Sequence, residues 1–458
     1  MDKKKDFNSI IDRPVVIIGA GVSGSSTAIR LLESGVTPLV VDAVNFPRDT
    51  VGEGLSAAIG PYLKELGIVD EINSGNFLKK VSLQLVSPGG YKSYTKIDLN
   101  KKPYKNGMHE FPWGFNVRRK NFDMVFLNRA RKLGAEIWLE TKATEYHVDK
   151  NGQICGVSLV DKDKNKIYVN TPLVIDCSGR RSLLAKQFEL RQPLQNIFEG
   201  QWANFAVRCH FRNVNMAPLK EQVQDYDFAT VNILPYIDCW YWFIPLEENL
   251  ISIGFVARSK MQQYLDKSLD KKSAYRKLLA KHPVLNEVIK DADMLDDVAV
   301  TSNLGHMNTR FSGKGYLCVG DAAFFADPAW GTGVTISLLT SKLASEIAIQ
   351  AIHENTYSEI FLGKYDKLYR EYLQNPVNSI RAFNYYYNDT DYVDFLVKRL
   401  GNNQYDMDVI GAVLFDYLPH KEFEKWTYRE FKEYVKQTGK IPTLNKVSQI
   451  NFDTFQAN

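Results

Sequence analysis

The first clear pattern in the chain is a short apolar run followed by a helical one. Residues 14–18 (PVVII) are apolar and β-branched, as in a strand buried within a parallel sheet. Residues 25–33 follow with helical spacing, and Gly35 ends that helix. Residues 38–41 (PLVV) form a second predicted strand, which ends at Asp42. This order predicts a βαβ unit.

Further along, strand and helix patterns are mixed. Residues 61–67 and 119–133 are predicted helices, and Gly134 closes the second of them. Residues 81–86 and 173–176 read as strands, the first with alternating polar and apolar positions. We therefore expect the region after the βαβ unit to contribute to more than one sheet.

The middle of the chain is rich in strand patterns and its end is helical. Residues 203–211, 241–245 and 250–256 predict an antiparallel sheet, and the pattern from Ile336 onward is helical and rich in aromatic residues. No internal repeat or low-complexity linker separates these parts. The predicted fold is α/β, with a Rossmann-like domain, an antiparallel β-sheet and a helical C-terminal region.

Composition narrows the class of protein. The 458 residues carry 57 basic and 53 acidic side chains, a formal charge of +4 that is spread along the chain, so a nucleic-acid partner is not expected. The five cysteines are far apart and form no C-x-x-C pair, which argues against a metal site and a disulfide framework and favours a reducing cytoplasm. No apolar run is long enough for a membrane span.

A glycine motif lies between the first strand and its helix. Residues 19–24 (GAGVSG) match G-x-G-x-x-G, in which glycines permit a tight turn and let backbone N–H groups approach a pyrophosphate. Asp42 stands 18 residues after Gly24 at the end of the second strand, where it can accept a hydrogen bond from a ribose. The predicted dinucleotide-binding residues of this unit are Gly19, Ala20, Gly21, Val22, Ser23, Gly24 and Asp42.

A second motif occurs almost 300 residues later. Residues 320–323 (GDAA) follow the apolar strand at 315–319 and precede a helix that begins near Gly333. The carboxylate of Asp321 can accept from a ribityl chain, which favours FAD over NAD, although GDAA alone is also compatible with a purely structural turn.

Three motifs together resemble a known superfamily. GAGVSG, residues 176–179 (DCSG) and GDAA are similar to the FAD monooxygenases of the p-hydroxybenzoate hydroxylase type, over roughly residues 14–345. Arg119, three residues before Phe122 and Asp123, matches the R-x-x-F-D helix start of that superfamily. The resemblance implies that Arg119 lies near the flavin and that Gly333 belongs to the loop beside it.

Residues 240–245 (WYWFIP) bring the chain closer to one branch of the superfamily. They match the W-x-W-x-I-P signature of the flavin-dependent halogenases at every fixed position. Trp240 and Trp242 alternate with the period of a strand, so both indoles point to one side and would wall the space between flavin and substrate. An aromatic core strand is the alternative interpretation.

The halogenase resemblance also implies a lysine. In that family the oxygenated flavin converts chloride or bromide to hypohalous acid, which travels through a tunnel to a lysine near the substrate. Spacing from Phe77 places Lys80 on that position, and Lys79 would point to the opposite face if this segment is a strand. A protonated Lys80 could hydrogen-bond hypohalite and polarise it, whereas a pair of surface lysines is the alternative.

Two positions depart from the halogenase pattern. The family reads F-x-x-P-x-x-S-x-G after GDAA, and here Gly331 stands at the serine. Thr332 and Gly333 still offer amides to a halide at a helix N-terminus. Glu53 lies in a segment similar to the family's V-G-E-S, with Gly54 in place of serine. It is predicted to face the flavin or the substrate tunnel, with a loop carboxylate as the alternative.

These assignments divide the chain into three parts. Residues 1–80, 105–180 and 300–345 are predicted to form a discontinuous FAD-binding domain, residues 81–104 and 181–299 the substrate-facing β-sheet domain, and residues 346–458 the helical C-terminal region. Three tyrosines in the last part, at positions 385–387, would cover the substrate mouth, or else belong to a core or an interface.

The sequence thus favours a halogenase over two alternatives. It predicts FADH2- and O2-dependent halogenation of an electron-rich phenol, pyrrole or indole, free or carrier-tethered, with chloride or bromide as co-substrate. A separate NAD(P)H-dependent flavin reductase is the implied partner. Gly331 and Gly54 favour the first alternative, a flavin monooxygenase that hydroxylates an aromatic small molecule or a Trp or Tyr side chain of a peptide. A flavin-dependent reductase is the second.

Overall fold

The computed structural model describes residues 7–103, 105, 112–197, 205–258, 268–328, 331–386, 389–414 and 421–442. A six-stranded sheet in the order β22-β23-β13-β2-β3-β9 lies at its centre, parallel except for the edge pair β22–β23. The strands are β2 (Val16–Ile18), β3 (Leu39–Val41), β9 (Glu136–Trp138), β13 (Val174–Asp176), β22 (Ser312–Gly313) and β23 (Tyr316–Cys318).

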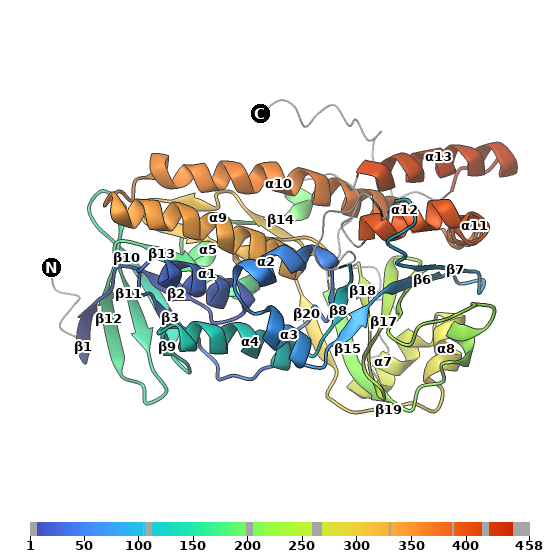
Figure 1. Cartoon of the computed structure of the whole chain (residues 1–458), viewed down its shortest axis with the longest axis horizontal. Helices are drawn as coiled ribbons and strands as arrows, with labels where there is room; N and C mark the ends of the chain where they lie inside the picture. The colour runs from blue at the N-terminus through green and yellow to red at the C-terminus, as the bar shows by residue number, and fades with distance from the viewer. Residues whose placement is uncertain are drawn as a thin grey trace.

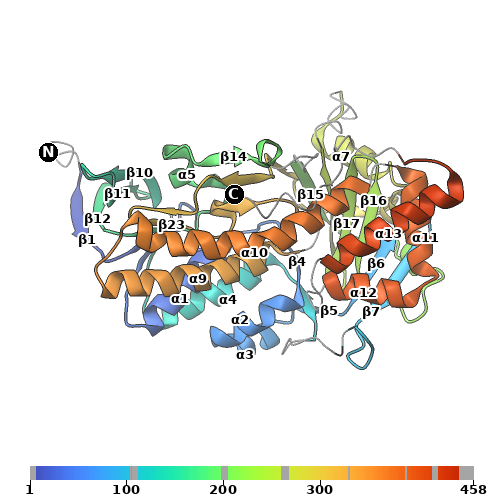
Figure 2. The same ribbon diagram turned by 90° about the horizontal axis from the view of Figure 1, so that it is seen from above.

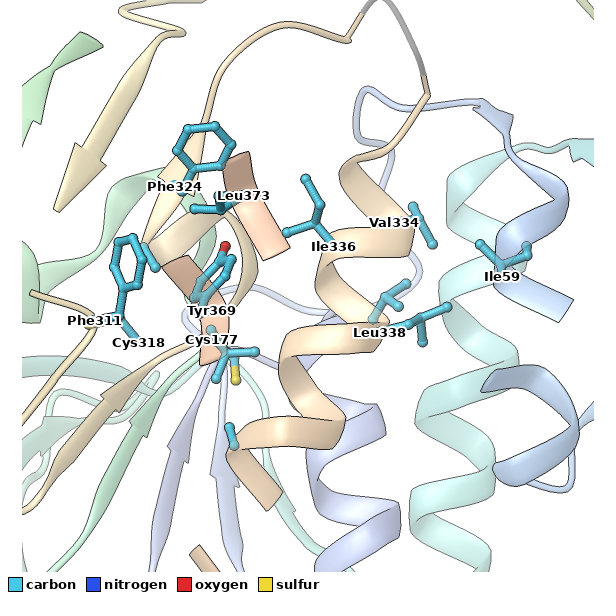
Figure 3. Close-up of a cluster of buried hydrophobic side chains, with 14 of the residues drawn as sticks. Ile59, Cys177, Phe311, Cys318, Phe324, Val334, Ile336, Leu338, Tyr369 and Leu373 are labelled. Atoms are coloured by element: carbon cyan, nitrogen blue, oxygen red, sulfur yellow. The ribbon is translucent and has the colours of Figure 1, made fainter. Parts of the chain in front are cut away.

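Helices cover one side of this sheet. Helix α1 (Val22–Glu33) connects β2 to β3, which confirms the predicted βαβ unit, and it packs against α4 (Arg119–Lys132) and α9 (Gly333–His353). Helix α10 (Glu359–Tyr386) lies over α9 (Figure 1). Figure 3 shows Ile336 of α9 among the buried side chains that include Phe324 and Tyr369, so apolar packing joins these helices to the strand ends.

Small elements flank the central sheet. A four-stranded sheet has the order β1-β12-β11-β10, and two three-stranded sheets have the orders β14-β21-β24 and β4-β8-β5. Their strands are β1 (Ser9–Asp12), β4 (Gly54–Leu55), β5 (Leu78–Lys80), β8 (Gly114–Asn116), β10 (Lys142–Val148), β11 (Ile154–Val160), β12 (Lys166–Asn170), β14 (Arg191–Pro193), β21 (His306–Asn308) and β24 (Phe324–Phe325). The short helices nearby are α2 (Gly60–Glu65), α3 (Val69–Ser74) and α5 (Leu183–Gln187).

An eight-stranded sheet forms the other end of the molecule (Figures 1 and 2). Its order is β19-β15-β18-β17-β16-β6-β7, with β20 also paired to β15. The strands are β6 (Ser82–Val86), β7 (Lys92–Lys96), β15 (Phe205–Arg212), β16 (Val231–Tyr236), β17 (Cys239–Glu247), β18 (Leu250–Ala257), β19 (Asp293–Met294) and β20 (Ala299–Ser302).

This sheet is mixed, so the expectation of an antiparallel sheet was wrong at one pair. Strand β6 runs parallel to β16, while the other pairs are antiparallel. A tight hairpin forces neighbouring strands to be antiparallel, but β6 and β16 are separated by the long excursion through α4 and β13, which leaves their direction free. The predicted strands at 81–86, 241–245 and 250–256 are confirmed. The strand predicted at 203–211 corresponds to β15, and residues 203 and 204 lie outside the described residues.

The two faces of the eight-stranded sheet bury different sets of side chains. Tyr241 and Phe243 of β17 pack into a separate apolar core with α7 (Lys271–Leu279) and α8 (Pro283–Ile289). Trp240 and Trp242 face the main core, which the sheet shares with the parallel sheet and its helices. Alternation along β17 therefore points both indoles into the middle of the molecule.

The C-terminal region is helical, as predicted. Helices α11 (Thr390–Gly401) and α12 (Gln404–Leu414) lie against β7, and α13 (Lys421–Thr438) packs on α10 and α12. Thr95 Oγ1 of β7 donates to Asp408 Oδ1 at 2.7 Å, and Ser93 Oγ donates to Val397 O at 2.5 Å. These bonds fix the helices on the edge of the eight-stranded sheet.

Candidate active site

The motifs that are far apart in the sequence meet at one edge of the parallel sheet. GAGVSG follows β2, Asp42 follows β3, DCSG ends β13 and GDAA follows β23, so all four lie at carboxyl ends of adjacent strands. The amide of Cys177 donates to Ile18 O at 2.8 Å, and a Cβ on Gly320 would lie 2.7 Å from Ser23 Oγ. Ligands of open α/β sheets bind at this edge.

The three glycines of the first motif meet different constraints. Gly19 has a φ of +104°, and a Cβ on Gly24 would lie 1.8 Å from Gly19 O, so both positions require glycine for the fold itself. A Cβ on Gly21 would meet only Arg48 Nη2, at 3.3 Å. No side chain caps the N-terminus of α1 at Gly21. This uncapped turn therefore leaves backbone N–H groups at the start of α1 that could bind a negatively charged group such as a pyrophosphate.

Asp42 and Arg48 flank that turn. Asp42 Oδ2 accepts from Ala20 N at 2.8 Å, and Oδ1 accepts from Val44 N at 3.1 Å, which holds the loop after β3 against the glycine turn. Each oxygen keeps a further lone pair for a ribose hydroxyl. Arg48 was not identified from the sequence, because no motif spacing marks it, although its guanidinium adds positive charge beside Gly21.

Asp321 lies among arginines. Burial raises the pKa of its carboxyl to about 6, against the opposing charges of Arg180, Arg119 and Arg191. Arg119 makes a two-point ion pair with Asp123, at 2.7 and 3.0 Å, and its Nη1 donates to Val51 O at 2.9 Å. The R-x-x-F-D spacing thus orients Arg119 toward the loop that carries Glu53.

Lys79 and Lys80 point to opposite faces of β5, as predicted. Lys80 is 7% exposed, whereas Lys79 is exposed, with its Nζ 4.0 Å from the centre of the Trp113 ring. The alternative of two surface lysines is therefore wrong for Lys80. Its Cε would lie 3.1 Å from a Cβ on Gly114, the residue opposite it on β8, so the absence of a side chain there makes room for the lysine stem.

The two indoles of β17 lie side by side. Their ring centres are 5.8 Å apart, and Trp240 and Trp242 are 6% and 4% exposed. A Cβ on Gly254 would lie 2.3 Å from Trp242 Cζ2, so this glycine in β18 leaves room for the indole. Strand β17 contacts β5 and β8, and Ile244, on the same face as the indoles, contacts Gly54. The tryptophan face therefore turns toward the small sheet that carries Lys80.

Glu53 is the centre of a buried polar cluster. Its Oε1 lies 2.7 Å from His210 Nε2 and 3.8 Å from Arg208 Nη1, and its Oε2 accepts from Ser252 Oγ at 2.6 Å. Burial raises the pKa of Glu53, but the hydrogen bond from His210 and the charge of Arg208 lower it further, so the carboxyl stays ionised below its ordinary pKa. Glu53 thus lies in the loop directly before β4, as the alternative has it, but its carboxylate is buried.

The partners of Glu53 were missed in the sequence. Their only signal is that Arg208 and His210 interrupt the apolar pattern of β15 on one face. Trp242 Nε1 donates to Ser252 Oγ at 3.1 Å, which links the W-x-W-x-I-P motif to Glu53. Two polar residues spaced two apart in an otherwise apolar strand, Arg208 and His210, therefore indicate a buried polar cluster here.

Thr332 and Gly333 begin helix α9, which extends to His353. No side chain caps this N-terminus, and the buried Thr335 Oγ1 has no hydrogen-bond partner among the described residues. Gly331, just before it, has a φ of +65°, and a Cβ there would lie 2.6 Å from Gly54 O. The two glycines that depart from the halogenase pattern therefore contact each other.

Several other predictions concern features of the described chain. All five cysteines are free, and neither a metal-binding group of His, Cys, Asp or Glu nor a helix able to cross a membrane occurs in the described ranges. The tyrosines at 385 and 386 end α10, but their side chains and residue 387 lie outside what the structure describes, as do residues 329 and 330.

Comparisons with known proteins identify relatives of this chain. A sequence profile of the tryptophan halogenase family matches residues 80–392. A 1H-pyrrole-2-carbonyl-(peptidyl-carrier protein) chlorinase of Pseudomonas fluorescens is 26% identical over 377 residues, 80% of this chain and 82% of that protein. Flavin-dependent halogenase ptaM of Pestalotiopsis fici is 25% identical over 373 residues, 77% of this chain and 66% of that protein. Flavin-dependent brominase Bmp2 has a similar structure, with a TM-score of 0.73 at 20% identity over 93% of this chain and 100% of that chain.

Proposed function

Because the chain belongs to the tryptophan halogenase family, we propose that it uses FADH2, O2 and chloride or bromide to halogenate an electron-rich aromatic ring. The observation that carries this proposal is the burial of Lys80 on β5, a strand that contacts β17, which carries Trp240 and Trp242. A buried ammonium is suited to hold a reactive oxidant in a place from which water is excluded.

The strand-end site fits FAD. The Gly21 turn and the uncapped start of α1 would hold the pyrophosphate, Asp42 the ribose, and Asp321 and Arg119 the part of the cofactor nearer the ring. When bound and reduced, FAD supplies the two electrons with which O2 oxidises a halide to hypohalous acid. We propose that a separate NAD(P)H-dependent reductase delivers this reduced form.

Thr332 and Gly333 would hold the halide. The free amides at the start of α9 and the dipole of this helix favour an anion, and the Thr335 hydroxyl adds an unused donor in the first turn. The protonated amine of Lys80 would then donate a hydrogen bond to the hypohalite oxygen, which makes the halogen more electrophilic toward the ring.

The substrate class follows from this chemistry. An electrophilic halogen requires an electron-rich ring, so we propose a phenol, pyrrole or indole, either free or attached to a carrier. The pyrrolyl-carrier chlorinase among the relatives supports the tethered form. Five free cysteines favour a reducing compartment such as the cytoplasm.

The test is a bromination assay with a matched lysine control. The protein is incubated with FAD, a flavin reductase, NADH, O2 and bromide, and hypobromite is trapped with a phenolic dye and followed by mass spectrometry. We expect Lys80→Ala to reduce ring bromination by about 100-fold or more, since it removes the positioned proton donor, while oxidation of reduced flavin continues. Lys79→Ala, on the exposed face of the same strand, is expected to retain activity. Equal activity of the two variants would show that Lys80 has no such role.

Direct hydroxylation is the second candidate, and Gly331 favours it. The left-handed φ of +65° at Gly331 and its contact with Gly54 O leave no space for the serine of the halogenase pattern. The P-x-x-G-x-G spacing of this loop is instead similar to the hydroxylases. A product that gains one oxygen, and that forms equally with and without halide, would establish hydroxylation and exclude halogenation.

A further inference from the structure

A line of polar side chains crosses the buried face of the eight-stranded sheet. It begins at Asp296, whose side chain is 47% exposed, and continues through a short contact with His210 Nδ1. The other ring nitrogen, Nε2, lies 2.7 Å from Glu53 Oε1. His210 and Glu53 are 1% and 3% exposed, so the line connects the surface to the interior through two buried titratable groups.

The charges of this line balance when His210 carries a proton. Glu53 and Asp296 face its two ring nitrogens, and Arg208 Nη1 lies 3.1 Å from Nε2, so two carboxylates then meet two cations. Burial lowers the pKa of His210, but the hydrogen bond and the charge of Glu53 raise it more, with Arg208 opposing and Asp296 assisting. The other charged or titratable groups nearby are Cys209 beside Asp296, Lys272 and Tyr275 of α7, and Arg119 of α4.

The inner end of the line lies at the proposed site. On one side of Glu53, Gly52 O accepts from Arg119 Nη1 at 3.4 Å, and on the other, Gly54 O contacts Gly331 of the halide loop. Ser252 connects Glu53 to Trp242. Glu53 therefore stands between the residues proposed for the flavin, the halide and the wall of the reaction space.

We propose that Asp296, His210 and Glu53 form a proton relay that delivers, from solvent to the active site, the proton that each halogenation consumes. The inference rests on the proposed function, whose balance is ArH + X⁻ + H⁺ + O2 + FADH2 giving ArX, FAD and two waters. One proton must enter from outside, because a halide anion becomes a neutral covalent halogen. The relay acts beside Lys80, which holds the oxidant.

The transfer keeps every group close to its resting state. The N–H bond at Nε2 of the protonated His210 breaks as a new O–H bond forms on Oε1 of the ionised Glu53. Glu53 then gives a proton to the oxygen that leaves as water and becomes ionised again. His210 is then neutral with its remaining proton on Nδ1, and it is reset when the ring exchanges to the Nε2–H tautomer and accepts a proton at Nδ1 from Asp296, which takes one from solvent. The transfers between Asp296 and His210 and between His210 and Glu53 follow contacts that already exist.

The first test needs neither flavin nor substrate. The protein has only seven histidines, so ¹³C-histidine NMR of the flavin-free chain can follow His210, assigned with His210→Gln. We expect wild-type His210 to titrate above the ordinary histidine pKa, and Asp296→Asn to lower that pKa by removing one of its two carboxylates. Asp297→Asn changes the same charge one residue further along the same exposed loop and is expected to leave the titration unchanged.

The second test measures how the rate of product formation depends on pH in the same variants. With saturating reduced flavin and bromide, product formation should fall as pH rises through the His210 pKa, and in Asp296→Asn this fall should occur at lower pH. Asp297→Asn should follow the wild type. His210→Gln should form product about 100-fold more slowly while it still binds FAD and still oxidises reduced flavin. A purely structural role would lower the rate without moving the pH at which it falls.

The outcomes separate the relay from the proposed function. Normal bromination by wild type, with the same pH profile in Asp296→Asn and Asp297→Asn, overturns the relay alone. A His210 titration that does not respond to Asp296→Asn also overturns it. A wild-type protein that brominates no ring at any pH overturns the proposed function, and the relay with it.

Discussion

At the scale of single residues, the contact between Gly331 and Gly54 explains why two departures from the halogenase pattern occur together. Gly331 is in the left-handed region, and any side chain there would strike a backbone carbonyl oxygen, which cannot move without shifting β4. A serine at 331 is therefore incompatible with this approach of β4 to the start of α9. Glycine at position 331, in place of the serine of the halogenase pattern, lets the backbone of this loop pack closely against Gly54 O.

This contact predicts that two glycine-to-serine changes will differ in how strongly they destabilise the protein. Gly331→Ser should destabilise the fold by about 1–3 kcal/mol, because of positive φ and the 2.6 Å approach to Gly54 O, and should weaken halide use by displacing Thr332. Gly54→Ser should be better tolerated, since its Cβ would meet Ile244 Cδ1 at an ordinary 3.4 Å. Thermal melts and the bromide concentration for half-maximal rate compare them. Equal destabilisation would mean that the contact does not limit position 331.

At the scale of elements, the packing of the C-terminal helices on β7 includes one close backbone approach in addition to the hydrogen bonds of Ser93 and Thr95. A Cβ on Gly401, at the end of α11, would lie 2.6 Å from Lys92 O. Gly401→Ala should therefore push α11 away from β7 and cost about 1–3 kcal/mol. Gly363→Ala, inside α10, has nothing within 4 Å of the new Cβ and should instead stabilise the protein by about 0.5–1 kcal/mol. Denaturant unfolding of both variants gives the comparison, and a loss at Gly363 as large as that at Gly401 would contradict this account.

Elements formed by neighbouring residues could be predicted from the sequence, and distant pairings could not. The β2-α1-β3 unit follows from local apolar spacing and glycines, and the opposite faces of Lys79 and Lys80 follow from strand alternation. The parallel pairing of β6 with β16 and the contact of His210 with Glu53 join residues about 150 positions apart. No local propensity encodes such contacts, because they depend on how the two sheets meet. The domain boundaries and the roles of the site residues remain predictions.

At the scale of the whole molecule, buried titratable groups connect stability to pH. Burial lowers the pKa of His282, which is 0% exposed beside the rings of Tyr236 and Tyr241, to about 4. Burial also lowers the pKa of His306 to about 4. Asp321 has the opposite effect on stability. Because its pKa is raised to about 6, its carboxyl binds a proton at a higher pH in the folded state than in the unfolded chain.

The two histidines should outweigh Asp321 on acidification. Below the unfolded histidine pKa of about 6.5 the unfolded chain binds protons on these histidines, whereas the folded protein binds them only near pH 4. The free energy of unfolding therefore falls between these two pH values, by on the order of 3 kcal/mol for His282. Denaturant unfolding at pH 7 and pH 4.5 measures this loss. His282→Phe keeps a ring between Tyr236 and Tyr241 but cannot be protonated, so its stability should fall less over the same interval. An equal fall in the variant and the wild type would mean that His282 does not titrate as its burial requires.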